Sequence, residues 1–176
     1  MLLHVDGSRL ANAAAALDVG LGDITARVGA DVVSFGGTKV GLLAGELIVV
    51  LNPSLLEALP YLRKQSMQLA SKMRFVSAQL EVLLTDDLWR PAASHANAMA
   101  RRLADAVGDH VQITQAVQAN SVFAILPPEA TAELQKDVEF YVWNEHTGEV
   151  RWMFAWDTPE ADVDAFAAAI VRVAGA

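Results

Sequence analysis

Cysteine is absent from this 176-residue chain, and so are long hydrophobic runs. Without cysteine there is no disulfide framework, no thiolate metal site and no cysteine nucleophile. No segment reaches the roughly 18 consecutive apolar residues that a membrane span requires. The N-terminal sequence MLLHVDGSRL contains His4 and Asp6, so it lacks the apolar core of a signal peptide. We therefore expect a cytoplasmic protein without a membrane partner.

An excess of positive charge is missing too. The chain has 13 Lys and Arg against 21 Asp and Glu, which gives a net charge of −8. A protein of this charge is a poor candidate for binding nucleic acid or an anionic membrane surface. Hydrophobic residues make up 53% of the chain and charged residues 19%, a composition that predicts a packed core.

The first part of the chain alternates between strand and helix patterns. Residues 1–5 predict a short strand, residues 8–17 an alanine-rich helix, and residues 22–29 a short helix with Asp23 as its N-cap. The sequences DVVSF and GELIVVL predict two more strands around a glycine-rich turn. This alternation indicates an α/β layer.

Helical patterns follow, and then strand patterns. From Leu62 onward, apolar residues spaced by three and four predict one long helix whose buried face is formed by Leu69, Met73, Val76, Leu80 and Leu83. Another helix is predicted from about 91 to 107. The sequence SVFAIL predicts a buried strand, EFYVWNE and EVRWMFAW a β-hairpin, and the last residues a helix with Thr158 as N-cap. The expected domains are residues 1–90 and a compact α+β domain over residues 91–176.

Lys39 lies inside the turn sequence SFGGTKVG, between two segments that are predicted to be buried strands. Glycines at 36, 37 and 41 allow the backbone to approach another group closely. Burial favours the neutral amine, which is the form that makes a Schiff base. The simpler interpretation is a surface lysine in a loop. A phosphate-binding P-loop is excluded because the spacing and the following hydroxyl residue are missing.

Two further sites have both a structural and a functional interpretation. Asp6 and Arg9 follow the first strand; Asp6 either caps a turn or helix, or presents a carboxylate where α/β folds bind ligands. Period two places Val150, Trp152 and Phe154 opposite Arg151. Arg151 either protects a strand edge or offers a planar fork to a carboxylate.

The remaining charged and polar residues do not indicate a specific functional site. Residues 58–80 contain Arg63, Lys64, Lys72 and Arg74 and no acidic residue, which indicates a solvated face, an anion site or a subunit contact. The four histidines have no metal-ligand spacing, so no metal is expected. No serine lies in a recognisable Ser-His-Asp pattern.

Four stretches together identify a family resemblance. The sequences HVDGSR, DVVSFGGTKVG, LRKQSMQLASKMRF and VRWMFAWDT occur in the order found in the low-specificity threonine aldolases, members of the β-eliminating lyase group of pyridoxal-phosphate (PLP) enzymes. SFGGTK and LLHVDGSR are the most specific of them. The resemblance covers nearly the whole chain but only the C-terminal half of the family's pattern.

The resemblance implies a fold and a set of roles. The fold would be α/β, part of the large domain of an aspartate-aminotransferase-like PLP-dependent transferase, plus the small C-terminal α+β domain. Lys39 resembles the lysine that carries PLP as a Schiff base, and Asp6 the aspartate that pairs with the pyridine nitrogen. Arg9 and Arg151 resemble the arginines that hold the substrate carboxylate. The implied reaction is retro-aldol cleavage of a β-hydroxy amino acid to glycine and an aldehyde.

The sequence also departs from the family pattern. Val40 stands where the resemblance implies asparagine, and Ser8 where it implies alanine. The family's first half holds the phosphate cradle, the histidine that stacks on PLP and part of the sheet, so we expect the chain to need a separate N-terminal half or to form homo-oligomers. The alternative hypothesis is a catalytically inactive remnant that folds or oligomerises without cofactor.

Overall fold

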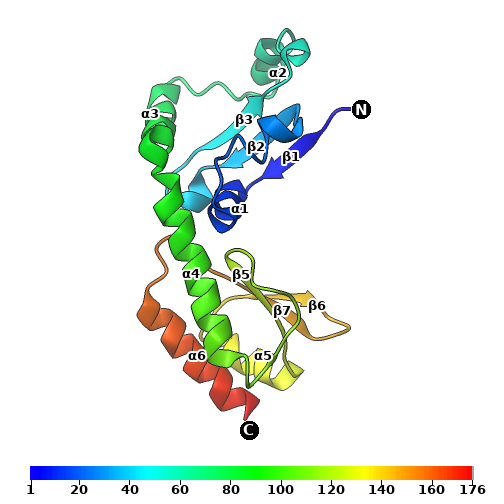
Figure 1. The fold of residues 1–176 in the computed structure, drawn as a ribbon, viewed down its shortest axis with the longest axis vertical. Coiled ribbons are helices and arrows are strands. Elements are labelled where there is room, and N and C mark those ends of the chain that lie inside the picture. Colours follow the sequence, from blue (N-terminus) through cyan, green and yellow to red (C-terminus); the bar gives the residue numbers. More distant parts are fainter. Residues whose placement is uncertain (176) are drawn as a thin grey trace. The chain divides into compact units, whose positions relative to one another are not determined.

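The computed structural model describes residues 1–175, which divide into two compact units, residues 1–92 and the residues from 93 onward. Both units combine helices with a small sheet, so the predicted mixture of α and β elements is confirmed (Figure 1). Among these residues, no helix is both long and apolar enough to cross a membrane.

The first unit is built on a three-stranded sheet in the order β1-β2-β3. Its strands are β1 (His4–Gly7), β2 (Val32–Gly36) and β3 (Glu46–Val50). β1 and β2 run parallel, with Asp6 opposite Ser34, whereas β3 is antiparallel to β2. The parallel pair brings the carboxyl ends of β1 and β2 to the same edge of the sheet, which is where the candidate site residues follow.

One face of this sheet is covered by α1 (Leu10–Leu17) and the other is open. Val33 and Phe35 are buried on the covered face, and Leu10 and Ala14 of the helix are buried with them. On the opposite face, Asp6 and Ile48 are exposed, because no segment within residues 1–175 packs over them. The apolar residues of the first unit are therefore only partly used in its own core.

The prediction of one continuous helix from Leu62 is wrong. The structure has two helices, α2 (Leu59–Gln65) and α3 (Met73–Leu84). α2 ends because Met67 adopts a positive φ of 54°, and the amides of Met67 and Gln68 bond back to the carbonyls of Lys64 and Arg63. Leu69 lies in the break and is 51% exposed, so the predicted apolar stripe begins only within α3.

Short 3-10 helices replace some predicted elements. They are η1 (Ala26–Val28), η2 (Thr38–Val40), η3 (Pro53–Leu55) and η4 (Thr85–Asp87). Asp23 caps no helix: its side chain accepts a bond from the Gly20 amide at 2.7 Å and pairs with Arg27 at 2.6 Å. The predicted helix over 22–29 is therefore a turn followed by η1.

The second unit places an antiparallel sheet against helices. The chain enters it through α4 (Trp89–Val107) and continues with β4 (Gln112–Ile113), β5 (Ser121–Ile125), α5 (Pro128–Leu134), β6 (Tyr141–Asn144), β7 (Glu149–Met153) and α6 (Glu160–Ala174). The sheet order is β4-β5-β7-β6. β6 and β7 form the predicted hairpin.

The core of the second unit is continuous. Leu103, Val122, Val150, Trp152 and Ile170 are almost completely buried, and Trp152 meets Phe166 edge-to-face with ring centroids 5.5 Å apart. The period-two pattern of β7 is confirmed, because Val150 and Trp152 face this core while Arg151 faces the other way.

The chain leaves the sheet sooner than the sequence suggests. β7 ends at Met153, and Trp156 is 42% exposed. The last helix begins at Glu160, and Thr158 is not its N-cap. The hydroxyl oxygen of Thr158 instead accepts a hydrogen bond from the Ala155 amide at 2.9 Å, which closes the preceding turn.

Candidate functional site

Asp6 occupies the carboxyl end of β1 and is exposed on the open face of the sheet. One carboxylate oxygen, Oδ1, accepts a hydrogen bond from the Ser8 amide at 3.2 Å. This bond fixes the side chain in a local turn, as the simpler interpretation expected. Asp6 does not cap α1, whose N-cap position is held by Arg9 without a side-chain cap. The carboxylate therefore still has capacity to accept a bond from a ligand.

Arg9 lies directly between β1 and α1 and is half-buried. Its carbonyl accepts the first helical bond, from the Ala13 amide at 3.1 Å. Arg9 is thus held at the same sheet edge as Asp6, three residues further along the chain.

Lys39 lies in η2, directly after β2. The turn is closed by Thr38, whose amide donates to the Gly45 carbonyl at 3.1 Å and whose hydroxyl oxygen accepts from the Gly45 amide at 3.1 Å. Val40 is 2% exposed and holds the turn against the core. Lys39 itself is exposed, which agrees with the simpler interpretation of a surface lysine in a loop and not with a buried lysine. The reason is that no segment among the described residues covers this face of the turn.

Gly36 explains why the turn is rich in glycine. A Cβ atom at this position would lie 2.6 Å from the Ser8 carbonyl oxygen and 3.0 Å from the Ser8 Cα. The Lys39 turn therefore packs directly against the backbone segment that joins Asp6 to Arg9. Gly41, which follows η2, has a φ of 114°, a conformation that side-chain-bearing residues rarely adopt.

The structure thus brings three of the four predicted site residues to one region. Asp6 lies at the carboxyl end of β1, Arg9 follows β1, and Lys39 follows the parallel strand β2. In open α/β sheets, ligands bind outside this end of the strands. A carboxylate, a guanidinium group and an amine at this edge form a candidate site for a small polar ligand.

Arg151, the fourth predicted residue, belongs to the second unit. It lies in the middle of β7, opposite Phe123 of β5 and Tyr141 of β6. Its guanidinium carbon lies 4.9 Å from the ring centre of Trp143 and 5.7 Å from that of Phe123. Because neighbouring strands on both sides pair with β7, Arg151 does not protect a strand edge.

Several features of this region were missed from the sequence. The contact between Gly36 and Ser8 joins segments nearly thirty residues apart, and no local pattern announces it. Phe123 and Trp143 lie around Arg151, and their strands were predicted, but the pairing that brings them together was not. The register of the predicted hairpin, if it had been worked out, would have placed Trp143 near Arg151.

The remaining polar groups form no metal site within the part of the chain that the structure describes. The ring of His95 bonds to the Thr158 carbonyl at 2.8 Å, and the ring of His4 to the Ser34 hydroxyl at 2.9 Å. In the basic stretch, Arg63 donates to the Gln68 carbonyl at 3.0 Å, and Arg74 stacks on Phe75 at 4.7 Å. These contacts are structural, and the exposed ammonium groups remain on the surface.

The fold is that of a known structural class. The structure of threonine aldolase from Leishmania major matches 99% of this chain with a TM-score of 0.87 and 30% sequence identity, and the match covers 52% of that chain.

The sequence profile of the family described as β-eliminating lyase matches residues 1–127. The chain therefore belongs to the β-eliminating lyase family, and the resemblance noted from its sequence is confirmed. A low-specificity L-threonine aldolase of a Pseudomonas species is 42% identical over 177 residues, and that of Pseudomonas aeruginosa is 41% identical. Each alignment covers 99% of this chain and 51% of the relative, so the chain spans about half the length of the curated relatives it matches.

Proposed function

We propose that this chain carries the lysine-bearing part of a PLP-dependent carbon–carbon lyase of the threonine-aldolase type. The reaction would be retro-aldol cleavage of a β-hydroxy amino acid to glycine and an aldehyde. The observation that supports this most directly is the common position of Asp6 and Lys39 at the carboxyl ends of two adjacent parallel strands. Family membership and the similarity to threonine aldolases support the assignment of PLP chemistry to these two residues.

The residues present fit PLP at this sheet edge. Asp6 has an exposed carboxylate with a single bond to Ser8, so it can accept a bond from a protonated ring nitrogen. Lys39 has an exposed amine that can reach an aldehyde carbon. The close contact of Gly36 with Ser8 holds the two segments at a fixed separation that a Cβ would disturb.

Each side chain has a distinct task in this proposal. PLP, when bound, supplies an electron-accepting ring that stabilises the negative charge left at Cα when the Cα–Cβ bond breaks. The Asp6 carboxylate would favour the protonated form of the ring nitrogen. Lys39 Nζ would be the amine that holds the cofactor. Arg9 and Arg151 would each be suited to a substrate carboxylate, because guanidinium groups match its geometry.

The proposal includes a partner for the open face of the first unit. The relatives are about twice as long as this chain, and Asp6, Lys39 and Ile48 are exposed on or beside an uncovered sheet face. An N-terminal half, or a second copy of the chain, would cover this face and supply the phosphate contacts of the cofactor. Exclusion of water there would strengthen the pairing of Asp6 with the ring nitrogen.

The experiment that tests the proposal is reductive trapping. The purified chain is mixed with an equimolar amount of PLP, reduced with borohydride and digested, and the phosphopyridoxyl group is located by mass spectrometry. We expect the label on Lys39, because the Asp6 carboxylate beside it favours the bound pyridinium. The other lysines, Lys64, Lys72 and Lys136, are internal controls in the same sample.

Two variants make the test specific. Asp6→Asn removes the charge that pairs with the ring nitrogen while conserving the side-chain shape, so we expect labelling of Lys39 to fall severalfold. Asp105→Asn changes an exposed carboxylate of the second unit and serves as the matched control. Weak labelling spread over all four lysines, unchanged by Asp6→Asn, would contradict the proposal and favour the remnant without cofactor.

A further inference from the structure

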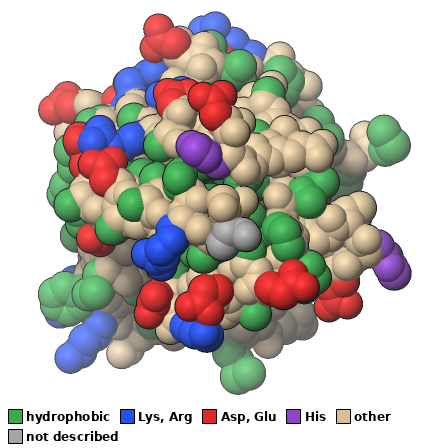
Figure 2. All heavy atoms as spheres, turned by 90° about the horizontal axis from the view of Figure 1, so that it is seen from below, with side chains coloured by type: hydrophobic (Ala, Val, Ile, Leu, Met, Phe, Trp, Pro, Cys, Tyr) green, Lys and Arg blue, Asp and Glu red, His purple; other side chains and the backbone are tan. Residues whose placement is uncertain are grey.

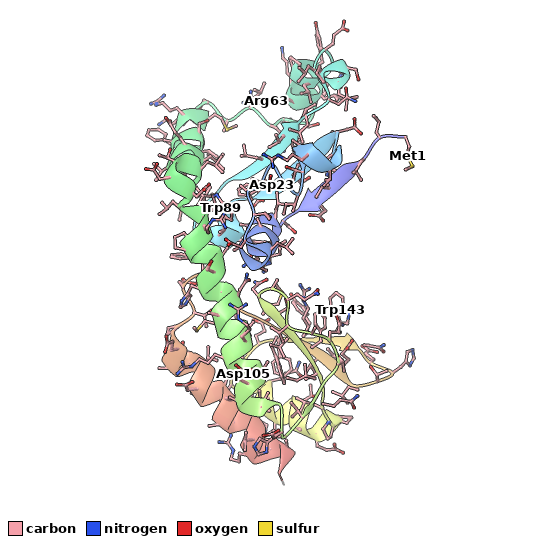
Figure 3. The ribbon with its side chains drawn as sticks, viewed as in Figure 1. Met1, Asp23, Arg63, Trp89, Asp105 and Trp143 are labelled. Atoms are coloured by element: carbon pink, nitrogen blue, oxygen red, sulfur yellow. The ribbon has the colours of Figure 1, made fainter. Side chains whose placement is uncertain are left out.

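Arg151 is enclosed by aromatic rings on the face of the second sheet that lies away from α5 and α6. Figure 3 shows Trp143 on that face of the sheet. The rings of Trp143 and Phe123 approach each other edge-to-face, with centroids 5.5 Å apart, and both lie within 6 Å of the guanidinium carbon of Arg151. Guanidinium groups at this distance from ring faces are attracted to the negative π surface. The rings therefore restrict the conformations that Arg151 can adopt.

Enclosure by the rings leaves one nitrogen of Arg151 without a partner. Nε is buried and makes no hydrogen bond, although an N–H group in this position ordinarily has an acceptor. A ligand cannot reach Nε from the side that Nε faces. The two terminal nitrogens, Nη1 and Nη2, are then the pair that a carboxylate meets, and it approaches end-on.

The acidic residue nearest to Arg151 on the same strand face is already engaged. Glu149 lies two residues before Arg151 on β7, and its Oε1 accepts a hydrogen bond from the Thr114 hydroxyl at 2.5 Å. Among residues 1–175, no carboxylate lies within ion-pairing distance of Arg151. The positive charge of Arg151 is therefore not neutralised by an ion pair within these residues, although the chain has a net charge of −8.

We propose that Trp143 and Phe123 are positioning residues that hold Arg151 for end-on binding of a carboxylate through Nη1 and Nη2. This inference rests on the proposed function, in which Arg151 binds the substrate carboxylate. A fork that is already oriented loses less conformational entropy when it binds than a free arginine does. Trp143 is the better residue to change, because it is 54% exposed and its removal leaves the core of the second unit intact.

The test uses the full 176-residue chain with ¹⁵N-labelled arginine and tryptophan, and acetate as the carboxylate probe. NMR measures two quantities: the solvent exchange rate of the Arg151 Nε–H and the acetate affinity at Arg151, with chloride at equal ionic strength as the reference. In Trp143→Ala we expect Nε–H exchange to rise roughly tenfold, because its cover is removed. Acetate affinity should fall roughly fivefold, the range of a cation–π contact.

Three variants separate the possible results. Trp143→Phe keeps a ring and should restore most of the protection and affinity. Trp156→Ala removes a 42% exposed tryptophan of the same unit that makes no ring contact with Arg151, and it should change neither quantity. Arg151→Lys keeps the charge but lacks the fork and the arginine signal. Its acetate response is therefore read from the indole N–H of Trp143, and it should be abolished.

The outcomes distinguish the inference from the function on which it rests. If Arg151→Lys removes acetate binding but Trp143→Ala alters neither exchange nor affinity, the positioning role is overturned and the carboxylate role of Arg151 stands. If the chain with Arg151 in place gives no acetate response beyond that of Arg151→Lys, the carboxylate role itself is overturned, and the positioning proposal falls with it.

Discussion

Asp31 connects three segments of the first sheet: the start of β1, the start of β2 and the end of β3. Its carboxylate accepts a bond from the Leu3 amide at 2.7 Å and another from the Asn52 side chain at 2.6 Å. These two bonds hold the pKa of Asp31 below its ordinary value of 3.8, and the bond from the Leu3 amide has the larger effect. The charged form is therefore the form that stabilises the start of β1 beside β2 and the exit of β3.

The bonds of Asp31 predict a pH-dependent effect on stability. Because the folded pKa is lowered, the contribution of Asp31 is fully present above pH 3.8 and is lost as the pH falls through the folded value. Asp31→Asn places an NH₂ group opposite one of the two donors, so we expect a lower urea midpoint than in the unchanged chain near neutral pH.

The same measurement at acid pH provides the check. The difference in midpoint between the unchanged chain and Asp31→Asn should narrow as the pH falls below 3.8. Asp105→Asn, in an exposed position of the second unit, should show no such convergence. A difference that stays constant across this pH range would show that the charge of Asp31 is not what stabilises the strands.

At the scale of elements, the position of the lysine turn depends on close packing between β1 and β2. The two strands pair along their length, and Gly36 at the end of β2 meets the backbone of Ser8, just beyond β1. Since the contact is with backbone atoms, a side chain at 36 can be accommodated only if the strands separate or the turn shifts. The same shift would move Lys39 away from Asp6.

Gly36→Ala is therefore predicted to destabilise the chain by about 1–3 kcal/mol, the usual cost of overpacking. It should also reduce trapping of PLP on Lys39. Chemical denaturation measures the first effect, and reductive labelling the second. Gly22→Ala is the matched control, because a Cβ at Gly22 meets nothing within 4 Å. Equal stability of the two variants would mean that the contact with Ser8 does not fix the turn.

At the scale of the whole molecule, the two units differ in how completely they bury their apolar residues. The second unit has a continuous core that encloses Leu103, Trp152 and Ile170, and only a few of its large apolar side chains are exposed, such as Trp143 and Trp156. The first unit exposes Ile48 on the open sheet face and Tyr61, Met67 and Phe75 on or near its helices. Exposed apolar surface of this kind indicates an interaction site. Figure 2 shows acidic, basic and hydrophobic side chains interleaved on the face seen from below.

We expect the chain to associate through the first unit at micromolar concentrations. Ile48 is 72% exposed on β3, a strand with an unpaired edge within residues 1–175, and such edges favour association. Ile48→Lys should lower the apparent mass measured by size-exclusion chromatography with light scattering. Val28→Lys, at a 60% exposed position outside the sheet, is the control. A concentration-independent monomer for the unchanged chain would contradict this prediction.

Local patterns in the sequence were enough for much of the fold. The sequence SVFAIL was predicted as a buried strand and forms β5, and alternation along EVRWMFAW identified the buried face of β7. The Asp-Gly turn after the first strand placed Asp6 at a strand end. The prediction of one long helix from Leu62 failed because Met67, a non-glycine residue just beyond the end of α2, adopts a left-handed conformation. Neither a glycine nor a proline signals this end in the sequence.

Motifs and periodicity within a few residues were enough to predict the family, most of the strands and helices, and the candidate site residues. The exposure of Lys39, the packing of Gly36 on Ser8 and the aromatic rings around Arg151 could be seen only in the folded structure. These features depend on strand pairing and register between distant segments. Pairing is fixed by the packing of the whole unit, and no short stretch of sequence contains that information.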